Sequence, residues 1–283
     1  MSVDVSHERA ADERAAGSAE PRHRTGTVRL LGRDIGYSAS PAMQQAAFHA
    51  LGLSLVYELT DVETGEVAGQ LERLRRGDGI GANVTTPHKR TVATLVDELV
   101  GDAQRLGAVN TVVVAGSRLI GHNTDQPAIA DELVTLVDHA PVHAVVLGSG
   151  GASGAVVDAL HGVGAGRVTH VTRHGDGPAF ADLPDVLRDA DLVVNATPIG
   201  TNEDVSPVPA ALLRPDLAVF DLIYRPSPTR LVRDARSVGA RARGGAGMLV
   251  GQGYRSLELW LGVPAPVDVM RDALRRELGD PDV

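Results

Sequence analysis

The chain has 283 residues, enough for one large domain or two ordinary ones. It is 43% hydrophobic and 22% charged, as globular proteins are, and it has no cysteine, which excludes disulfides, cysteine-bound zinc and thiol nucleophiles. The formal net charge of −9 and the lack of a long apolar run argue against nucleic acid or a membrane as the main partner.

The first 26 residues are polar, carry charges of both signs and have almost no large apolar side chains. Such a segment cannot bury enough apolar surface to offset its loss of conformational entropy, so a disordered leader is predicted over 1–26. The segment lacks the apolar stretch of a secretory signal peptide, and a cytoplasmic location is the expectation.

Strands and helices alternate from residue 27 to residue 125. The apolar pattern predicts three strands and three helices: strands over 27–32, 54–59 and 79–84, and helices over 42–51, 67–75 and 89–99. Ser40 is expected to be the N-cap of the first helix, with Pro41 at its first position. Two short apolar runs, 111–114 and 119–120, flank Gly116-Ser117 and indicate a hairpin.

A second α/β unit follows a helix expected over 126–137. The run at 143–147 is rich in valine, which is typical of a strand buried on both faces. The remaining elements follow in order: a helix over 155–161, strands over 168–172, 192–196 and 218–222, and helices over 228–238, 248–261 and 267–278.

Lys89 is the only lysine among the 27 basic residues of the chain. Arginine keeps its charge, whereas an amine can give and accept a proton, so a chain that otherwise uses arginine retains lysine where an amine is needed. Coding bias with one chance survivor is the alternative. The residues before it, Gly81 to His88, add amides and hydroxyls directly after a predicted strand, which favours a functional site.

A glycine-rich segment, residues 148–154, follows the valine-rich strand and precedes a helix. This is the context that a dinucleotide-binding motif requires: Gly148 permits the tight turn, Gly150 lets the backbone approach a pyrophosphate, and Ser153 is the third small residue. Arg173 ends the next strand, where NAD sites usually have an acid, and a guanidinium there suits a 2′-phosphate. A solvated Arg173 and a purely structural turn are the alternatives.

Three further polar positions are candidates, each with a structural alternative. Asp125 can be a helix N-cap, or it can complete with Lys89 the amine and carboxylate needed for proton transfer to oxygen. Ser38 and Ser40 place two hydroxyls on one turn, where they can hold a carboxylate or a hydroxyl. Asn110 either ends a strand or faces a ligand. The ten histidines show no convincing pattern for a metal, so none is expected.

Eight short motifs in one order resemble the shikimate/quinate dehydrogenase family over residues 27–280. They are Ser38-Ala39-Ser40-Pro41, Gly81 to Lys89, Ala108-Val109-Asn110-Thr111, Asn123-Thr124-Asp125, Gly148 to Ser153, Asn195-Ala196-Thr197-Pro198, Asp221-Leu222-Ile223-Tyr224, and Gly245-Ala246-Gly247-Met248-Leu249 with Gln252.

The resemblance implies an α/β fold with two domains. The N-terminal α/β substrate-binding domain would span 27–125 and be closed by C-terminal helices over 248–280; a Rossmann-type domain for NADP would span 126–247. The implied catalytic pair is Lys89 and Asp125. The implied substrate-binding residues are Ser38, Ser40, Asn83, Thr85, Asn110, Tyr224 and Gln252. The implied cofactor-binding residues are Gly148, Ser149, Gly150, Gly151, Ala152, Ser153, Thr172, Arg173, Thr197, Leu222, Gly245 and Met248.

The implied activity is NADP-dependent interconversion of 3-dehydroshikimate and shikimate. Three departures from the family pattern stand out: Gln44-Gln45 where His-Asn is common, Gln126 where Gly commonly follows Asp125, and a shortened segment 174–177 without a second basic residue. The last leaves NAD use open. A dehydrogenase for quinate or an aminated analogue is the first alternative and a dinucleotide-binding sensor without turnover is the second; a homodimer is left open.

Overall fold

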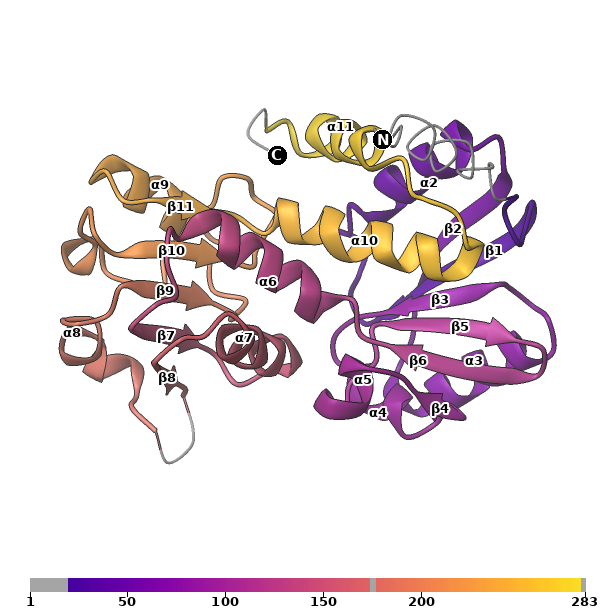
Figure 1. Cartoon of the computed structure of the whole chain (residues 1–283), viewed down its shortest axis with the longest axis horizontal. Helices are drawn as coiled ribbons and strands as arrows, with labels where there is room; N and C mark the ends of the chain where they lie inside the picture. The colour runs from indigo at the N-terminus through magenta and orange to yellow at the C-terminus, as the bar shows by residue number, and fades with distance from the viewer. Residues whose placement is uncertain (1–19, 174–176, 281–283) are drawn as a thin grey trace, which may run out of the picture.

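The computed structural model describes residues 20–173 and 177–280. They form two lobes, each built on its own sheet, and two helices, α6 (Asp125–Leu136) and α10 (Ala246–Leu261), lie between the lobes (Figure 1). The predicted α/β class is confirmed. Over the described ranges, no helix combines the length and the apolar character needed to cross a bilayer.

The first lobe contains a mixed six-stranded sheet. Its strand order is β2 (Ser54–Asp61), β1 (Thr25–Gly32), β3 (Gly81–Val84), β5 (Thr111–Ala115), β6 (Arg118–His122) and β4 (Glu98–Leu99). β1 pairs in parallel with β3, with Leu31 opposite Val84. The chain segments that follow these two strands therefore leave the sheet at the same edge, and they carry the serine turn and Lys89.

Helices cover both faces of this sheet. One face packs against α2 (Ser40–Ala50), α10 and α11 (Val267–Leu278), with Phe48, Trp260 and Met270 fully buried. The other face packs against α3 (Val67–Arg75), α4 (Lys89–Ala93) and α5 (Asp102–Leu106). A short 3₁₀ turn, η1 (Thr64–Glu66), directly precedes α3 in the chain. The C-terminal helices thus complete the core of the first lobe, a long-range arrangement visible in Figure 1.

Trp260, the only tryptophan of the chain, connects α10 to the sheet through a hydrogen bond. Its Nε1–H donates to the Val112 carbonyl at 3.0 Å. Gly81 makes room for the ring, because a Cβ at that position would lie 2.4 Å from Trp260 Nε1. This contact fixes the helix that carries Gln252 relative to the strands.

The second lobe is a parallel five-stranded sheet. Its order is β11 (Ala242–Arg243), β10 (Ala218–Asp221), β9 (Leu192–Asn195), β7 (His143–Leu147) and β8 (Arg167–Val171). Every residue of β7, β9 and β10 is buried, because α6 and α7 (Gly151–Gly162) cover one face. The other face packs against η2 (Phe180–Asp182), α8 (Leu183–Val186), η3 (Ala210–Leu212) and α9 (Arg230–Ser237). Strand order reverses beside β7, the place where such sheets bind ligands at their carboxyl ends.

The predicted leader, residues 1–26, overlaps the first strand at its C-terminal end. β1 begins at Thr25, two residues before the predicted strand, and the Arg22 N–H donates to the Leu261 carbonyl at 2.8 Å. Residues 1–19 of the predicted leader lie outside the described residues.

The expectation that Ser40 is the N-cap of α2 is wrong. Ala39 occupies that position, and Ser40 is the first helical residue and is buried. The Ser38 Oγ accepts the Ser40 backbone N–H at 3.3 Å, so Ser38 supplies the local oxygen.

The limits of several helices differ from those predicted, and the differences are largest in α4 and α7. α4 ends at Ala93 instead of 99, because Thr91, Val92, Thr94 and Val96 are β-branched and the next residues, Glu98–Leu99, pair with β6. α5 was not predicted. α7 begins at Gly151 rather than 155, so most of the glycine-rich segment forms the first turn of a helix.

Candidate active site

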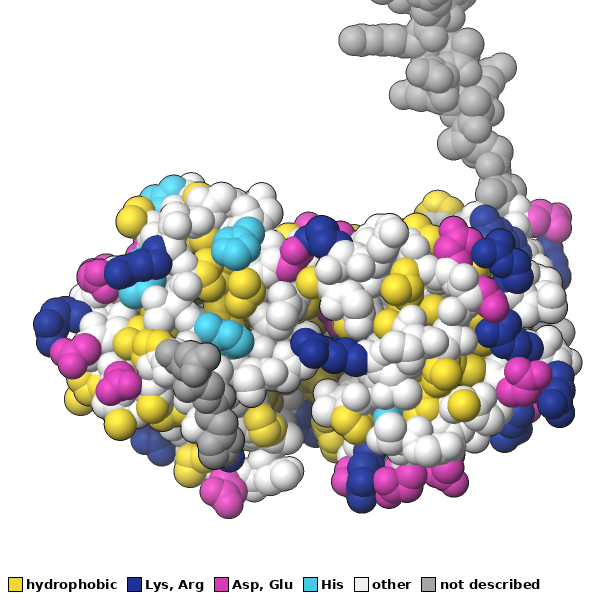
Figure 2. Space-filling model, turned by 90° about the horizontal axis from the view of Figure 1, so that it is seen from below, with side chains coloured by type: hydrophobic (Ala, Val, Ile, Leu, Met, Phe, Trp, Pro, Cys, Tyr) yellow, Lys and Arg dark blue, Asp and Glu magenta, His cyan; other side chains and the backbone are white. Residues whose placement is uncertain are grey.

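Two cavities meet between the lobes. The inner pocket, about 190 Å³, lies against the first lobe, and the outer cavity, about 590 Å³, lies at the glycine-rich segment. Figure 2 shows the notch between the two lobes from below. Five residues line both cavities, which therefore adjoin: Tyr37, Thr86, Ala152, Leu222 and Tyr224.

The nine residues predicted to act in catalysis and substrate binding all line the inner pocket: Ser38, Ser40, Asn83, Thr85, Lys89, Asn110, Asp125, Tyr224 and Gln252. They come from segments up to about two hundred positions apart in the sequence, and the fold brings them together.

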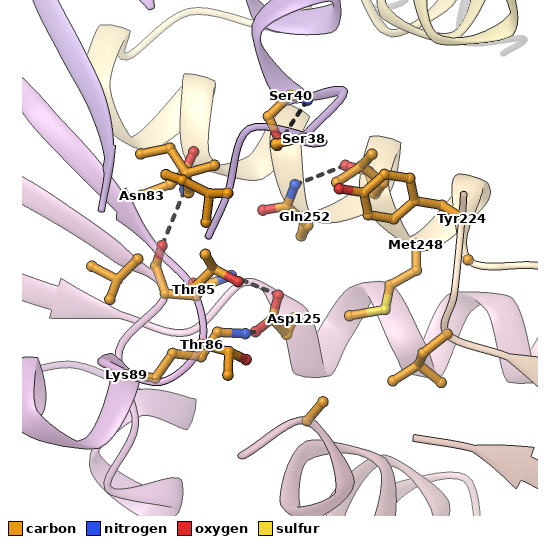
Figure 3. A pocket seen from close by; sticks show the side chains of 18 of the residues that line it. Ser38, Ser40, Asn83, Thr85, Thr86, Lys89, Asp125, Tyr224, Met248 and Gln252 are labelled. Atoms are coloured by element: carbon orange, nitrogen blue, oxygen red, sulfur yellow. Dashed lines mark hydrogen bonds and ion pairs between the residues drawn. The ribbon is translucent and has the colours of Figure 1, made fainter. Parts of the chain in front are cut away.

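Lys89 and Asp125 face each other in the inner pocket (Figure 3). The Lys89 Nζ lies 2.6 Å from Asp125 Oδ2, and the two side chains are 15% and 8% exposed. Asp125 is the first residue of α6, where the helix dipole favours a negative charge. An ammonium has three N–H donors, so a ligand in the pocket can also accept from Lys89.

The second oxygen of Asp125 is fixed by Asn110, whose Nδ2 donates to Oδ1 at 2.8 Å. Asn110 is itself held, since its Oδ1 accepts the Thr124 backbone N–H at 2.8 Å. Asn123 Oδ1 accepts the Asp125 backbone N–H at 3.1 Å. These contacts leave the carboxylate little freedom, so Lys89 has one well-defined ionic partner.

Asn83 lies in the pocket wall but uses its amide inside the protein. Its Oδ1 accepts the Tyr57 hydroxyl proton at 2.7 Å, and its Nδ2 donates to Ser256 Oγ at 3.0 Å and to the Asn110 carbonyl at 3.1 Å. Burial raises the pKa of Tyr57 above its ordinary value, which keeps this phenol a donor. Asn83 therefore acts here as a support for its neighbours.

A hydroxyl cluster, Thr111, Thr124 and Ser256, connects Asn83 to the catalytic candidates. Ser256 Oγ lies 2.7 Å from Thr111 Oγ1 and 3.2 Å from Thr124 Oγ1, and all three residues are buried. The sequence did not identify Ser256 or Tyr57, because an isolated hydroxyl on an apolar helix or strand has no distinguishing pattern.

The opposite wall of the inner pocket carries the two serines, Gln252 and Tyr224 (Figure 3). Gln252 donates through Nε2 to the Leu249 carbonyl of its own helix at 2.8 Å. Burial, reinforced by Tyr37 and opposed by a hydrogen bond with Ser38, raises the pKa of Tyr224 to about 12. The phenol is therefore neutral near pH 7 and can donate a proton to an acceptor.

The glycine-rich segment forms one wall of the outer cavity. Gly148 has φ +114°, and a Cβ there would lie 2.9 Å from the Ala196 carbonyl oxygen, so the turn requires glycine. A Cβ on Gly150 or Gly151 would meet no atom within 4 Å, which leaves the N-terminus of α7 open to a ligand. Backbone N–H groups at a helix N-terminus bind phosphate, so the cavity fits a dinucleotide.

The predicted cofactor residues divide into three groups. Eight line the outer cavity: Gly148, Ser149, Gly150, Gly151, Ala152, Arg173, Thr197 and Leu222. Gly245 and Met248 line the inner pocket instead, and Ser153 and Thr172 are not among the lining residues of either. Ser153 is buried and donates to the Gly150 carbonyl at 2.7 Å, so it stabilises the turn from behind. Residues 174–176 of the shortened segment lie outside the described residues.

Several lining residues were not among the predicted site residues, and Tyr37, Thr86 and Phe180 are three of them. Tyr37 and Thr86 line both cavities, and Phe180 of η2 lines the outer one. Tyr37 directly precedes a recognised residue and Thr86 directly follows one, so their positions were available but their type gave no signal. In the part of the chain that the structure describes, no group of three or more metal-ligating side chains is present.

Comparison with known proteins gives a consistent result. The first lobe matches the family model "Shikimate dehydrogenase substrate binding domain" over residues 30–112, and residues 245–275 match "Shikimate 5'-dehydrogenase C-terminal domain". A shikimate dehydrogenase (NADP(+)) of Methanopyrus kandleri is 39% identical over 90% of this chain and 96% of the relative.

Solved structures with the same fold include two of particular interest. Shikimate 5-dehydrogenase from Thermus thermophilus, in complex with NADP(H) and shikimate, is 36% identical, with a TM-score of 0.81 over 89% of this chain and 100% of the other. Quinate dehydrogenase from Corynebacterium glutamicum, in complex with NAD, is 27% identical, with a TM-score of 0.80 over 89% and 99%.

Proposed function

Since the chain belongs to the shikimate dehydrogenase family, we propose that it interconverts 3-dehydroshikimate and shikimate, with NADP as the hydride carrier. The observation that carries this proposal is the Lys89–Asp125 pair, held at 2.6 Å in a pocket that adjoins a cavity walled by a helix N-terminus. An amine beside a carboxylate suits a reaction in which a carbonyl oxygen gains and loses a proton.

The residues of the outer cavity fit NADP. The α7 N-terminus and the open space at Gly150 suit the pyrophosphate, and Arg173 supplies a guanidinium for the 2′-phosphate. When bound, the cofactor would accept a hydride as NADP⁺ or donate one as NADPH. The adjoining inner pocket, with Gly245 and Met248 in its wall, would place the substrate against the nicotinamide end.

Lys89 and Asp125 provide the proton chemistry in this proposal. In the reductive direction, the Lys89 ammonium donates a hydrogen bond to the ketone oxygen and stabilises the negative charge that develops there. It then gives that oxygen a proton. Asp125 keeps the amine in place and accepts the neighbouring hydroxyl of the ring. Asn110 holds the carboxylate so that little reorganisation is needed during the reaction.

The remaining polar groups of the inner pocket bind the substrate. Ser38, Ser40 and the neutral phenol of Tyr224 hold the carboxylate through hydroxyl donors, while Thr85 and Gln252 contact ring hydroxyls. Asn83, with its amide bonded to Tyr57 and Ser256, acts by keeping the wall of the pocket in place. We place the substrate-binding domain at 27–125 with helices over 248–280, and the NADP domain at 126–247.

An assay panel tests this function. Shikimate, quinate and aminated analogues are each offered with NADP⁺ and with NAD⁺, and kcat/KM is measured for every pair. The highest value is expected for shikimate with NADP⁺. A higher value for quinate would support the first alternative, to which the fold of a quinate dehydrogenase lends support. Cofactor binding without turnover of any acid would support a sensor.

The partners of the chain are otherwise predictions from composition. The substrate is a small cyclohexene or cyclohexane carboxylic acid, and at −9 the net charge gives no reason to expect nucleic acid or an anionic membrane. A cytoplasmic location stays a prediction, and gel filtration decides between a monomer and a homodimer.

A further inference from the structure

Tyr37 is a half-exposed aromatic residue at the junction of the two cavities. The residue is 50% exposed, in a chain with only 3% aromatic residues. It lines both the inner pocket and the outer cavity, and it directly precedes Ser38. Single exposed apolar side chains are common, so exposure alone means little; its position between two ligand sites is the informative observation.

Tyr37 stacks on Tyr224, whose backbone follows a strand of the second lobe while its side chain packs against the core of the first lobe. The ring centroids are 6.3 Å apart and the ring planes make an angle of 29°, within the range of offset stacking. Tyr37 lies between β1 and α2 in the first lobe, and Tyr224 follows β10 in the second. The pair therefore spans the mouth of the site and connects the two lobes there.

Each tyrosine stands on a segment that is tied to its own lobe. The turn that contains Tyr37 is closed by the Ser38 N–H donating to the Ile35 carbonyl at 2.9 Å, and the Ile35 N–H donates to Asp61 Oδ2 at 3.4 Å. The segment before Tyr224 is held by the buried Asp221, whose Oδ1 accepts the Ile223 N–H at 3.1 Å. Movement of one lobe relative to the other must therefore change the stack.

We propose that Tyr37 couples the binding of substrate to the binding of the cofactor by stacking on Tyr224 across the mouth of the site. The inference rests on the proposed function, because it takes the inner pocket as the substrate site and the outer cavity as the dinucleotide site. A ligand that draws the lobes together strengthens the stack, and the closed arrangement favours the second ligand. Such coupling is reciprocal.

The test uses a pair of ligands that bind together without reacting. Shikimate and NADPH are both reduced, so they form a dead-end complex with the full-length protein. The dissociation constant of shikimate is measured by calorimetry with and without saturating NADPH, and the ratio is the coupling factor. In the wild type, shikimate binds more tightly with NADPH. Loss of the stack in Tyr37→Ala is expected to reduce the coupling factor about three- to tenfold.

Tyr37→Phe is the matched control, because a phenyl ring stacks equally well and only the hydroxyl is lost. It should retain the wild-type coupling factor. A coupling factor in Tyr37→Ala equal to that of the wild type, a wild-type factor of one, or an equal loss in the Phe and Ala variants would each overturn the proposal. Thermal unfolding of each variant shows whether it folds; a half-exposed side chain should change the midpoint little.

The two proposals fail in different ways. Without turnover of shikimate by the wild type, the proposed function falls and the coupling falls with it. With turnover present and the coupling factor of Tyr37→Ala unchanged, only the role of Tyr37 is wrong.

Discussion

The two lobes offer their ligands different kinds of surface. In the first lobe the functional groups are side chains, and they are already bonded to one another: Lys89 to Asp125, Asp125 to Asn110, and Asn83 to Tyr57. In the second lobe the ligand site is mostly backbone, a glycine turn at the start of α7 with open space around it. The first lobe should therefore be sensitive to side-chain chemistry, and the second to the volume of a single added methyl group.

The strongest test of this contrast is the removal of the amine. Lys89→Ala is expected to lower kcat by about 10²–10⁴ with KM within a few-fold of wild type, because Lys89 acts mainly in the transition state. Lys89→Arg should recover little activity, since a guanidinium does not give up a proton. Near wild-type kcat in the Arg variant would contradict the proton-transfer role.

The next test compares two glycines of the second lobe. Gly148→Ala should destabilise the protein by about 1–3 kcal/mol, because φ is +114° and the new Cβ would lie 2.9 Å from the Ala196 carbonyl. Gly150→Ala has open space, so its thermal midpoint should stay near wild type while the KM for NADP⁺ rises several-fold, since the methyl group enters the place of the phosphates.

A suitable control lies within α7, the helix that Gly150 precedes. A Cβ added to Gly154 would meet no atom within 4 Å, and Gly154 lines neither cavity. Gly154→Ala should therefore leave the KM unchanged and raise stability by up to about 1 kcal/mol. Equal KM values for the Gly150 and Gly154 variants would argue against phosphate binding at this turn.

The preference for NADP over NAD is expected to depend on one side chain, Arg173, in a site that otherwise consists mostly of backbone groups. Arg173→Ala should reduce the preference for NADP over NAD by about ten- to a hundredfold, the effect of losing one charge-assisted hydrogen bond of roughly 1.5–3 kcal/mol. The ratio of kcat/KM values for the two cofactors measures it. A preference for NAD in the unmutated protein would show that this interpretation of the strand end is wrong.

The smallest effects are expected at the serines of the first lobe. Ser38→Ala or Ser40→Ala removes one neutral donor to the substrate carboxylate, which is remote from the reacting carbon, so KM should rise more than kcat falls. Shikimate should still exceed quinate in kcat/KM, but as a preference rather than an exclusive choice, because a pocket rejects an added hydroxyl only modestly unless it leaves that hydroxyl unpaired. Equal changes in kcat and KM would place these serines closer to the chemistry than proposed.

Elements set by local sequence patterns were predicted well, and elements set by contacts with distant segments were not. Helix α3 was predicted with its observed limits, because Val67, Leu71 and Leu74 recur at helical spacing and all three are buried. The limits of α4 and the existence of α5 were not predicted, because short helices have little periodicity and are set by neighbours such as β6. Lys89 was found through its rarity, a property of the whole chain.

The residues around the site were harder to predict than those within it. The motifs named nine catalytic and substrate-binding candidates that all line the inner pocket. Ser256 and Tyr57 were missed because their hydroxyls contact the site only in the folded structure. Ser40 was assigned to a helix cap because local rules give serine that role, whereas the observed turn uses Ser38 instead.

The last helices of the chain have a consequence for how the protein is made. The core of the first lobe contains Val250, Trp260, Met270 and Leu274, which leave the ribosome long after its strands. The second lobe has its sheet complete by β11, before those residues are synthesised. At about 5–20 residues per second, the first lobe exposes an unfinished apolar surface for roughly ten seconds or more while the later half emerges and folds. The nascent chain is thus expected to need protection by chaperones at its beginning rather than at its end.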